Sequence, residues 1–246
     1  MTTPPSPQLK FATKAAPLPK RLKHAQEAGF RHAELFLNNK HLDQWKGLAE
    51  LAEQYNLNYG LHFPNRPPLS PKQLKKSVKL YRRLDCDAMV IHHPMYQLYG
   101  QDLLDIDPDL CLAVENHRLN LKNFWQWAAS NRYLTLDVEH MWKYTLKQGH
   151  FDLLLKTLKK FLKQHGSQVR RVHLPGYHPS GKEHQPISFN PRLGKKVFTA
   201  LANIDYQGLV VSETRPTLQT VDLLKQDVDL YQHWLKKRTA KLLKKR

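Results

Sequence analysis

The chain contains little cysteine and no long apolar segment. Its two cysteines, Cys86 and Cys111, stand at unrelated positions, which excludes a disulfide framework and suits a reducing cytoplasm. No apolar run approaches the roughly 18 residues that a membrane-spanning helix needs. The N-terminal sequence MTTPPSP has neither a basic stretch nor an apolar core, so no signal peptide is predicted. We therefore expect a cytoplasmic protein without a membrane-spanning segment.

Acidic residues are scarce relative to basic ones. The 246 residues include 39 Lys and Arg against 21 Asp and Glu, which gives a formal net charge of +18. Such a charge attracts polyanions, including nucleic acid and phosphorylated metabolites. Two basic runs, at residues 72–83 and 156–163, repeat every three or four positions, which predicts solvated outer faces of helices. Residues 236–246 form a basic C-terminal tail, either a frayed end or an arm for nucleic acid, and we expect it to be peripheral to folding.

The apolar pattern alternates between short strands and longer helices. Strands are predicted at residues 9–12, 31–37, 59–63, 88–92, 111–115, 133–137, 169–174 and 208–212. Helices are predicted at residues 19–28, 41–55, 70–84, 121–130, 150–165, 191–202 and 218–235, and residues 95–110 as a loop with a short helix. Near-continuous apolar strands are typical of a parallel sheet that is covered on both faces. With the length of the chain, this pattern predicts an α/β protein, a single (β/α)8 TIM barrel over residues 1–246.

Most of these strands carry or end in a side chain that binds metals. Because the carboxyl ends of parallel strands meet at one end of a barrel, such side chains converge there. The four strongest candidates follow the fifth to the eighth strands: Glu115, Asp137, His173 and Glu213. Further candidates for metal or substrate binding are Glu34, His62, His92, His140 and His184.

Three carboxylates in one barrel mouth repel one another unless a cation neutralises them. Carboxylates combined with an imidazole suit Mn²⁺ or Zn²⁺, and also Mg²⁺ or Co²⁺. Salt bridges to nearby basic residues are the alternative, and these are Arg118, Lys143, Arg171 and Arg215. Because the four strongest candidates come from four different strands, we favour a divalent metal site.

The four residues resemble the metal site of the xylose isomerase-like TIM barrels. That superfamily contains endonuclease IV-type apurinic endonucleases and isomerases or epimerases of sugars and sugar phosphates. The resemblance covers nearly the whole chain in strand order, and it implies that Glu115, Asp137, His173 and Glu213 are the metal ligands. It also implies that the further histidines bind either additional metal ions or the substrate, and these are His62, His92, His140 and His184.

Two departures from the superfamily leave the choice of subfamily open. The Asp of an endonuclease Asp-x-His pair falls on Lys182, which cannot bind a metal while it is protonated, although the adjacent Glu183 offers a carboxylate. A substrate-binding Glu of the ketose 3-epimerases falls on Leu121. The arginine that those epimerases use after the strand-seven histidine is also missing, because the chain reads Leu-Pro-Gly-Tyr there.

The resemblance implies two alternative chemistries. In an isomerase or epimerase of a sugar or sugar phosphate, the metal stabilises an enediolate, Glu115 and Glu213 transfer the proton, and His140 binds a substrate oxygen. In an apurinic endonuclease, two or three zinc ions clamp a phosphodiester, and the positive charge steers DNA. We place the isomerase first because Lys182 removes one expected zinc ligand and no DNA-reading insertion is evident.

The segment after the seventh strand is long and contains two glycines. Residues 175–189 include Gly176 and Gly181, and such a segment at the mouth of a barrel is typical of a flap. We predict that this flap brings His184 into the pocket.

Overall fold

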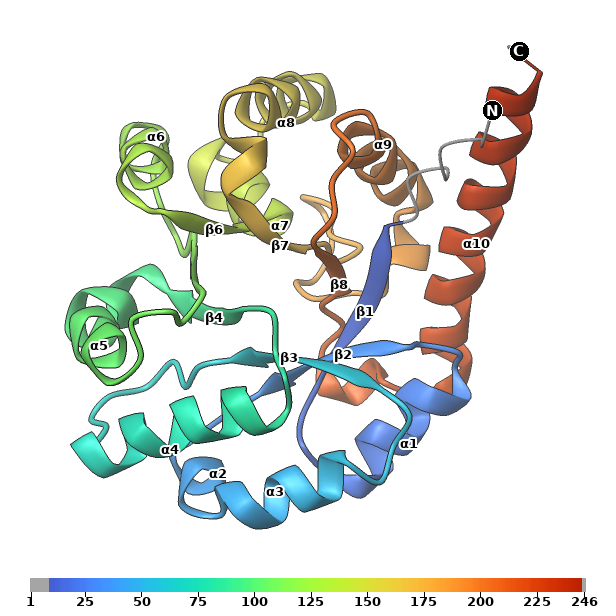
Figure 1. Cartoon of the computed structure of the whole chain (residues 1–246). Coiled ribbons are helices and arrows are strands. Elements are labelled where there is room, and N and C mark those ends of the chain that lie inside the picture. Colours follow the sequence, from blue (N-terminus) through green and yellow to red (C-terminus); the bar gives the residue numbers. More distant parts are fainter. Residues whose placement is uncertain (1–8, 245–246) are drawn as a thin grey trace, which may run out of the picture.

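The computed structural model describes residues 9–244, and eight parallel strands within this range close into a barrel (Figure 1). The strands are β1 (Lys10–Ala15), β2 (His32–Phe36), β3 (Asn58–His62), β4 (Met89–His92), β5 (Leu112–Glu115), β6 (Tyr133–Asp137), β7 (Val169–His173) and β8 (Leu209–Ser212). Each pairs with its neighbours in sequence, and β8 closes the barrel against β1. The predicted (β/α)8 TIM barrel is therefore confirmed. The predicted domain, 1–246, also includes residues 1–8 and 245–246, which lie outside the described residues.

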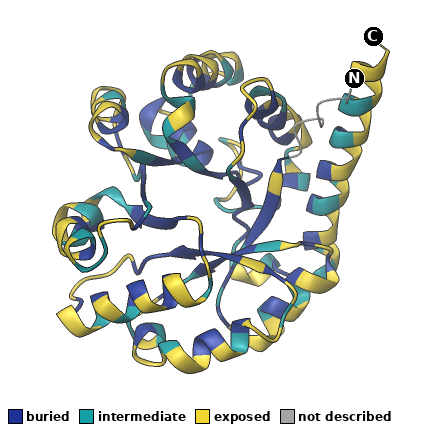
Figure 2. Ribbon diagram, in the orientation of Figure 1, coloured by how far each residue is buried: buried dark blue, intermediate teal, exposed yellow. Residues whose placement is uncertain are grey.

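Helices surround this barrel (Figure 1). The α-helices other than α7 are α1 (Pro19–Glu27), α2 (Asn39–Asp43), α3 (Trp45–Ala52), α4 (Pro71–Arg83), α5 (His93–Ile106), α6 (Leu121–Ser130), α8 (Phe151–His165), α9 (Pro191–Ala202) and α10 (Val221–Leu243). The remaining helices are α7 (Val138–His140), the π-helix η1 (Met141–Thr145) and the 3-10 helices η2 (Gly166–Gln168), η3 (Ile187–Phe189) and η4 (Pro216–Leu218). Their outer faces are exposed and their inner faces buried (Figure 2). Within residues 9–244, no helix combines the length and the apolar character needed to cross a membrane.

Three helix predictions are corrected, those for residues 41–55, 95–110 and 218–235. Residues 41–55 form two helices, α2 and α3, that meet at Gln44. Residues 95–110, predicted as a loop with a short helix, contain most of the 14-residue helix α5. Pro94 lies in its first turn, where proline is tolerated. Its apolar stripe is weak because it buries only Met95, Gly100 and Leu103, and this explains the missed prediction.

The last helix extends into the predicted tail, because α10 continues to Leu243 and not only to residue 235. Arg238 packs over the ring of Trp234 and donates hydrogen bonds to the carbonyl oxygen of Ala202, at 3.1 Å, and to Oδ1 of Asn203, at 3.2 Å. The first residues of the tail are therefore helical, and one of them is docked on the preceding helix.

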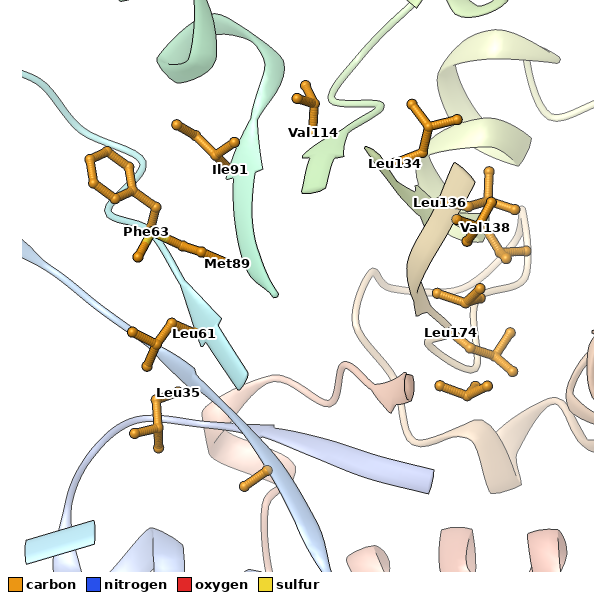
Figure 3. Close-up of a cluster of buried hydrophobic side chains, with 14 of the residues drawn as sticks. Leu35, Leu61, Phe63, Met89, Ile91, Val114, Leu134, Leu136, Val138 and Leu174 are labelled. Atoms are coloured by element: carbon orange, nitrogen blue, oxygen red, sulfur yellow. The ribbon is translucent and has the colours of Figure 1, made fainter. Parts of the chain in front are cut away.

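The barrel strands separate an apolar outer layer from an interior that also holds acidic, basic and imidazole side chains. Buried apolar side chains between strands and helices form one cluster that includes Leu35, Leu61, Ile91, Val114 and Leu136 (Figure 3). Successive strand residues point to opposite faces of a sheet. The residues next to these apolar ones therefore point into the barrel, and they include Glu34, His62, His92, Glu115 and Asp137. Because of this alternation, the candidate side chains all point towards the barrel axis.

Candidate metal centre

Glu115, Asp137 and His173 are the last residues of three adjacent strands, β5, β6 and β7. Their side chains meet, and one donor atom from each lies within 4.8 Å of the others. Glu213 follows β8, and its Oε2 lies 3.3 Å from Nδ1 of His173. The same Nδ1 lies 3.5 Å from Oε2 of Glu115. The structure thus brings the four predicted ligands together at the C-terminal end of the barrel, and all four are buried.

The donor atoms of these residues fit a divalent cation. Oδ2 of Asp137, Nδ1 of His173 and Oε2 of Glu213 are buried without a hydrogen-bond partner among residues 9–244. A buried polar atom left unpaired typically costs about 1–3 kcal/mol. Burial, helped by the charges of Glu213 and Glu115, raises the pKa of Asp137 despite the opposing influence of His140. A cation held by the four residues would pair with the free atoms and remove the repulsion.

The two glutamates of the site are held in the carboxylate form. Burial alone would raise the pKa of Glu115, but His92 and His173 outweigh it and hold that pKa well below the usual range. Burial would likewise raise the pKa of Glu213, but Lys14 and His173 lower it well below the usual range. Both groups are therefore ionised and can serve as ligands of a cation.

Two more predicted histidines approach Glu115. Nε2 of His62 lies 3.3 Å and Nε2 of His92 lies 3.4 Å from its Oε2, and donor atoms of the three residues lie within 4.8 Å of one another. Burial, with the charge of Lys14, lowers the pKa of His62 to about 4, which keeps the ring neutral. A second group of ligand-type atoms thus shares Glu115 with the first.

His140 lies beside the same carboxylates. Its Nδ1 is 3.2 Å from Oε1 of Glu115 and 3.5 Å from Oδ2 of Asp137. Asp137 caps the short helix α7, because its Oδ1 accepts the backbone N–H of His140 at 2.7 Å. Burial alone would lower the pKa of His140, but Asp137 and Glu115 raise it to about 9. In the protein without a bound ion, the two carboxylates thus favour the protonated form of the His140 ring.

The segment after β7, residues 175–189, which was predicted to be a flap, brings Glu183 and His184 to the wall of the cavity at the site. The backbone N–H of His184 donates to Oε2 of the buried Glu139 at 3.0 Å, and the His184 Nδ1 lies 4.0 Å from Oε2 of Glu213. Glu183 forms an ion pair with Lys143, and it offers donor atoms near those of Glu139 and His184. Lys182 is exposed. The structure thus places His184 and Glu183 at the site and turns Lys182 outward.

Glu34 occupies a different place from the other candidates. Its Oε1 lies 3.0 Å from Nε2 of His173, on the side of the ring opposite to Nδ1. Glu34 is fully buried and does not line the pocket described below. The structure therefore places it behind a candidate ligand rather than beside the ion.

Two charged residues of the site were missed in the sequence. Lys14 forms an ion pair with Glu213, but the first strand was predicted to end at residue 12, whereas β1 runs to Ala15. A lysine at the end of an apolar strand was the available signal. Glu139 is 1% exposed, and burial, with the charge of Asp137, raises its pKa to about 8. Its position directly before His140 gave no separate signal.

A pocket of about 300 Å³ opens above the site. Glu115, His140 and Glu213 belong to its wall, and other residues that line it are Lys14, Phe36, Arg118, Tyr144 and Arg215. Pockets of this size bind small molecules. Neither of the two arginines forms an ion pair with a carboxylate in the described part of the chain, so both remain available for an anionic group of a ligand.

Comparison with known proteins supports this description of the fold. No protein-family model matches the sequence, and no curated protein sequence matches it. Among solved structures, a D-tagatose 3-epimerase-like protein is similar at a TM-score of 0.64 and 16% identity, over 95% of this chain and 100% of that chain. D-allulose 3-epimerase from Methylomonas sp., in complex with D-allulose, gives 0.59 and 18% over 92% and 97%. Endonuclease IV from Thermus thermophilus gives 0.59 and 14% over 93% and 99%.

The closed barrel, with its acidic and histidine side chains at the C-terminal end, has the architecture of TIM-barrel enzymes. The three similar structures are members of the xylose isomerase-like TIM-barrel superfamily. This chain has the fold of that superfamily, as the resemblance of its four candidate ligands predicted. Since one fold supports many activities, the function must be argued from the site.

Addition of Mn²⁺ or Zn²⁺ to metal-free protein should raise its melting temperature. A ligand present at 100 times its Kd stabilises the folded state by about 2.7 kcal/mol, which corresponds to roughly 5–10 °C for a chain of this size. Thermal scans after dialysis against a chelator measure the shift. Asp137→Asn should lose most of it, whereas Asp205→Asn, at an exposed residue far from the ligands, should keep it. An undiminished shift in Asp137→Asn would exclude Asp137 as a ligand.

Proposed function

We propose that the protein is a divalent-metal-dependent isomerase or epimerase of a sugar or sugar phosphate. The observation that carries this proposal is the convergence of Glu115, Asp137, His173 and Glu213 beside a pocket of about 300 Å³. A space of that volume suits a single sugar unit. Two of the four residues, Glu115 and Glu213, also line the pocket, so a substrate there would touch them directly.

The four residues would hold the ion, and the pocket residues would act on the substrate. When bound, a divalent ion supplies Lewis-acid polarisation of a carbonyl. Glu115 and Glu213 would move the proton at the neighbouring carbon, since both face the pocket and both are held as carboxylates. The ring of His140, which lines the pocket, would donate a hydrogen bond to a substrate oxygen. Lys14 balances the charge of Glu213.

The arginines of the pocket favour a phosphorylated substrate. Arg118 and Arg215 line the cavity, and neither is neutralised by an ion pair with any residue in the range 9–244. Nε of Arg215 is buried without a hydrogen-bond partner in that range. Guanidinium groups bind phosphate through several directed N–H donors. A sugar phosphate would therefore satisfy donors that a neutral sugar leaves unpaired.

Arg215→Met should raise the KM for a phosphorylated ketose by about 10- to 100-fold, because a hydrogen bond to a charged group contributes roughly 1.5–3 kcal/mol. The KM for the same ketose without phosphate should change little. Arg132→Met is the matched control, since Arg132 is exposed near the start of β6, at the opposite end of the barrel. Equal changes in KM for both sugars would argue against phosphate recognition by Arg215.

An endonuclease IV-like, zinc-dependent apurinic endonuclease is the second candidate. The specific observation that favours it is the second ligand group, His62, His92 and Glu115, which shares Glu115 with the first. Such sharing is what a cluster of two or more ions needs. The net charge of +18 and the basic end of α10 would also attract DNA.

Metal counting and an abasic-site assay separate the two candidates. For an isomerase we expect one tightly held ion per chain and no incision of duplex DNA at an abasic site. His92→Ala should then keep the ion and weaken substrate binding, because His92 lines the pocket. Two or three zinc ions per chain, loss of metal in His92→Ala and chelator-sensitive incision would establish the endonuclease instead.

A further inference from the structure

A series of ion-paired side chains crosses the barrel interior beneath the candidate metal centre. Asp87 stands just before β4, at the N-terminal end of the barrel, and pairs with both terminal nitrogens of Arg171. Nε of Arg171 lies 3.8 Å from Oε2 of Glu34. Oε1 of Glu34 lies 3.0 Å from Nε2 of His173. These ion pairs thus connect the N-terminal end of the barrel to His173, a candidate ligand.

This arrangement is unusual for the interior of a TIM barrel, where layers of branched apolar side chains are the rule. The side chains of Arg171 and Glu34 are 1% and 0% exposed. Buried ion pairs seldom add net stability over apolar residues of similar volume, because desolvation of both charges offsets their attraction. Stability alone therefore does not account for charged residues at these positions.

Gly60 leaves space for the Arg171 side chain of this series of ion pairs. A Cβ atom at residue 60 would lie 2.8 Å from Nη2 of Arg171 and 3.4 Å from its Nε. A glycine in the interior of a strand often marks such a close approach by another group. The local structure of β3 is thus adapted to the guanidinium group of Arg171.

We propose that Arg171 and Glu34 are positioning residues for His173. Arg171 holds the carboxylate of Glu34 in place, and Glu34 faces the Nε2–H of His173. The other ring nitrogen, Nδ1, is thereby directed at Glu115 and Glu213, where it serves as a metal ligand. Carboxylates that accept the second N–H of a ligating histidine fix its orientation, and their loss typically weakens metal binding by about 10- to 100-fold. The identity of the ion rests on the proposed function, but the contact between Glu34 and His173 does not.

The burial of Glu34 supports this role. Its Oε1 lies within hydrogen-bonding distance of Nε2 of His173, and apart from this contact neither of its oxygens has a hydrogen-bond partner in the range 9–244. Its ionic contacts are therefore with His173 and Arg171 alone among the described residues. A buried carboxylate with so few partners is costly to keep, which is expected where it directs a functional side chain.

Variants at residue 34 test the contact with His173. In metal-free wild-type protein, NMR should show a slowly exchanging Nε2–H signal from the His173 ring. Glu34→Leu should abolish that signal and weaken Mn²⁺ binding by about 10- to 100-fold, as measured by competition with a chelator. Glu34→Gln keeps an acceptor oxygen, so it should keep the signal and lose less affinity. An unchanged signal in Glu34→Leu overturns the proposal, even if the wild type binds no metal and the proposed function is wrong.

Variants at residue 171 separate positioning from a structural role. Arg171→Met leaves Glu34 without its buried cation, so we expect loss of both stability and Mn²⁺ affinity. The double variant Glu34→Leu/Arg171→Met has no unpaired charge at these two positions, and its melting temperature should recover without recovery of affinity. Gly60→Ala, which removes no charge, should weaken Mn²⁺ binding severalfold by displacing Arg171. Arg170→Met, at the neighbouring residue outside the barrel, should leave affinity unchanged. Wild-type affinity for Mn²⁺ in the double variant would show that the ion pairs of Glu34 and Arg171 have a structural role only.

Discussion

Glu115→Gln should abolish catalysis, with a loss in turnover of about 10²- to 10⁴-fold, the range typical of general acid–base groups. Glu115 ends β5, lines the pocket and is approached by four histidine rings within 3.5 Å. A neutral amide cannot accept the substrate proton, and it is a weaker ligand for a divalent cation. Glu213→Gln should have a similar effect for the same reasons.

Deuterium exchange measures this loss. In D₂O, the wild type should incorporate deuterium at the carbon next to the carbonyl of a ketose or ketose phosphate, and NMR follows the signal. Glu50→Gln is the matched control, because the side chain of Glu50 is 65% exposed on α3. Exchange at the wild-type rate in Glu115→Gln, with metal content unchanged, would remove Glu115 from the proton-transfer step.

Tyr231→Ala should destabilise the protein by about 3–5 kcal/mol, the range for removal of a large aromatic side chain from a core. Tyr231 of α10 is 3% exposed and lies between β1 and α9. Its ring stacks on Phe11 at 4.9 Å and packs against Phe198 at 5.5 Å. Its hydroxyl donates to the carbonyl oxygen of Leu9 at 2.5 Å. Chemical denaturation monitored by circular dichroism gives the free energy of unfolding.

Two controls accompany this prediction. Tyr231→Phe loses only the hydrogen bond and should cost about 0.5–1.5 kcal/mol. Removal of residues 239–246, beyond the docked Arg238, should change stability little and should lower salt-dependent binding to heparin. A small effect of Tyr231→Ala would mean that α10 contributes little to the closure of the barrel.

The ligand-type residues at the strand ends were predictable because each is recognised from a short stretch of sequence. An apolar run that stops at Glu115, Asp137 or His173 is visible in the sequence, and the geometry of a parallel barrel then implies convergence. Helix α4 was equally clear, since Ser70 and Pro71 are typical residues for the start of a helix, and Ser70 is its N-cap. Both features depend on residues that are close together in the chain.

Contacts between distant segments were not predictable in the same way. Lys14 contacts Glu213, which is 199 positions away in the sequence, and no motif near either residue predicts this contact. Glu34 was a candidate ligand on the strength of its strand, but its side chain faces the far nitrogen of His173. Arg171 was considered as a salt-bridge partner of the candidate ligands, and its partner Asp87 lies in the turn before β4. These relationships arise only when the barrel closes.

The pairing of β1 with β8 has a consequence for biosynthesis. The ribosome adds Glu213 199 residues after Lys14, and the two side chains meet only when β8 docks against β1. Until then the nascent chain exposes an unpaired edge on β1, which is a template for aggregation. Any prematurely terminated product that ends before Glu213 lacks both this closure and one of the four candidate ligands. On the proposed function, no activity is therefore expected from any chain that ends before Glu213.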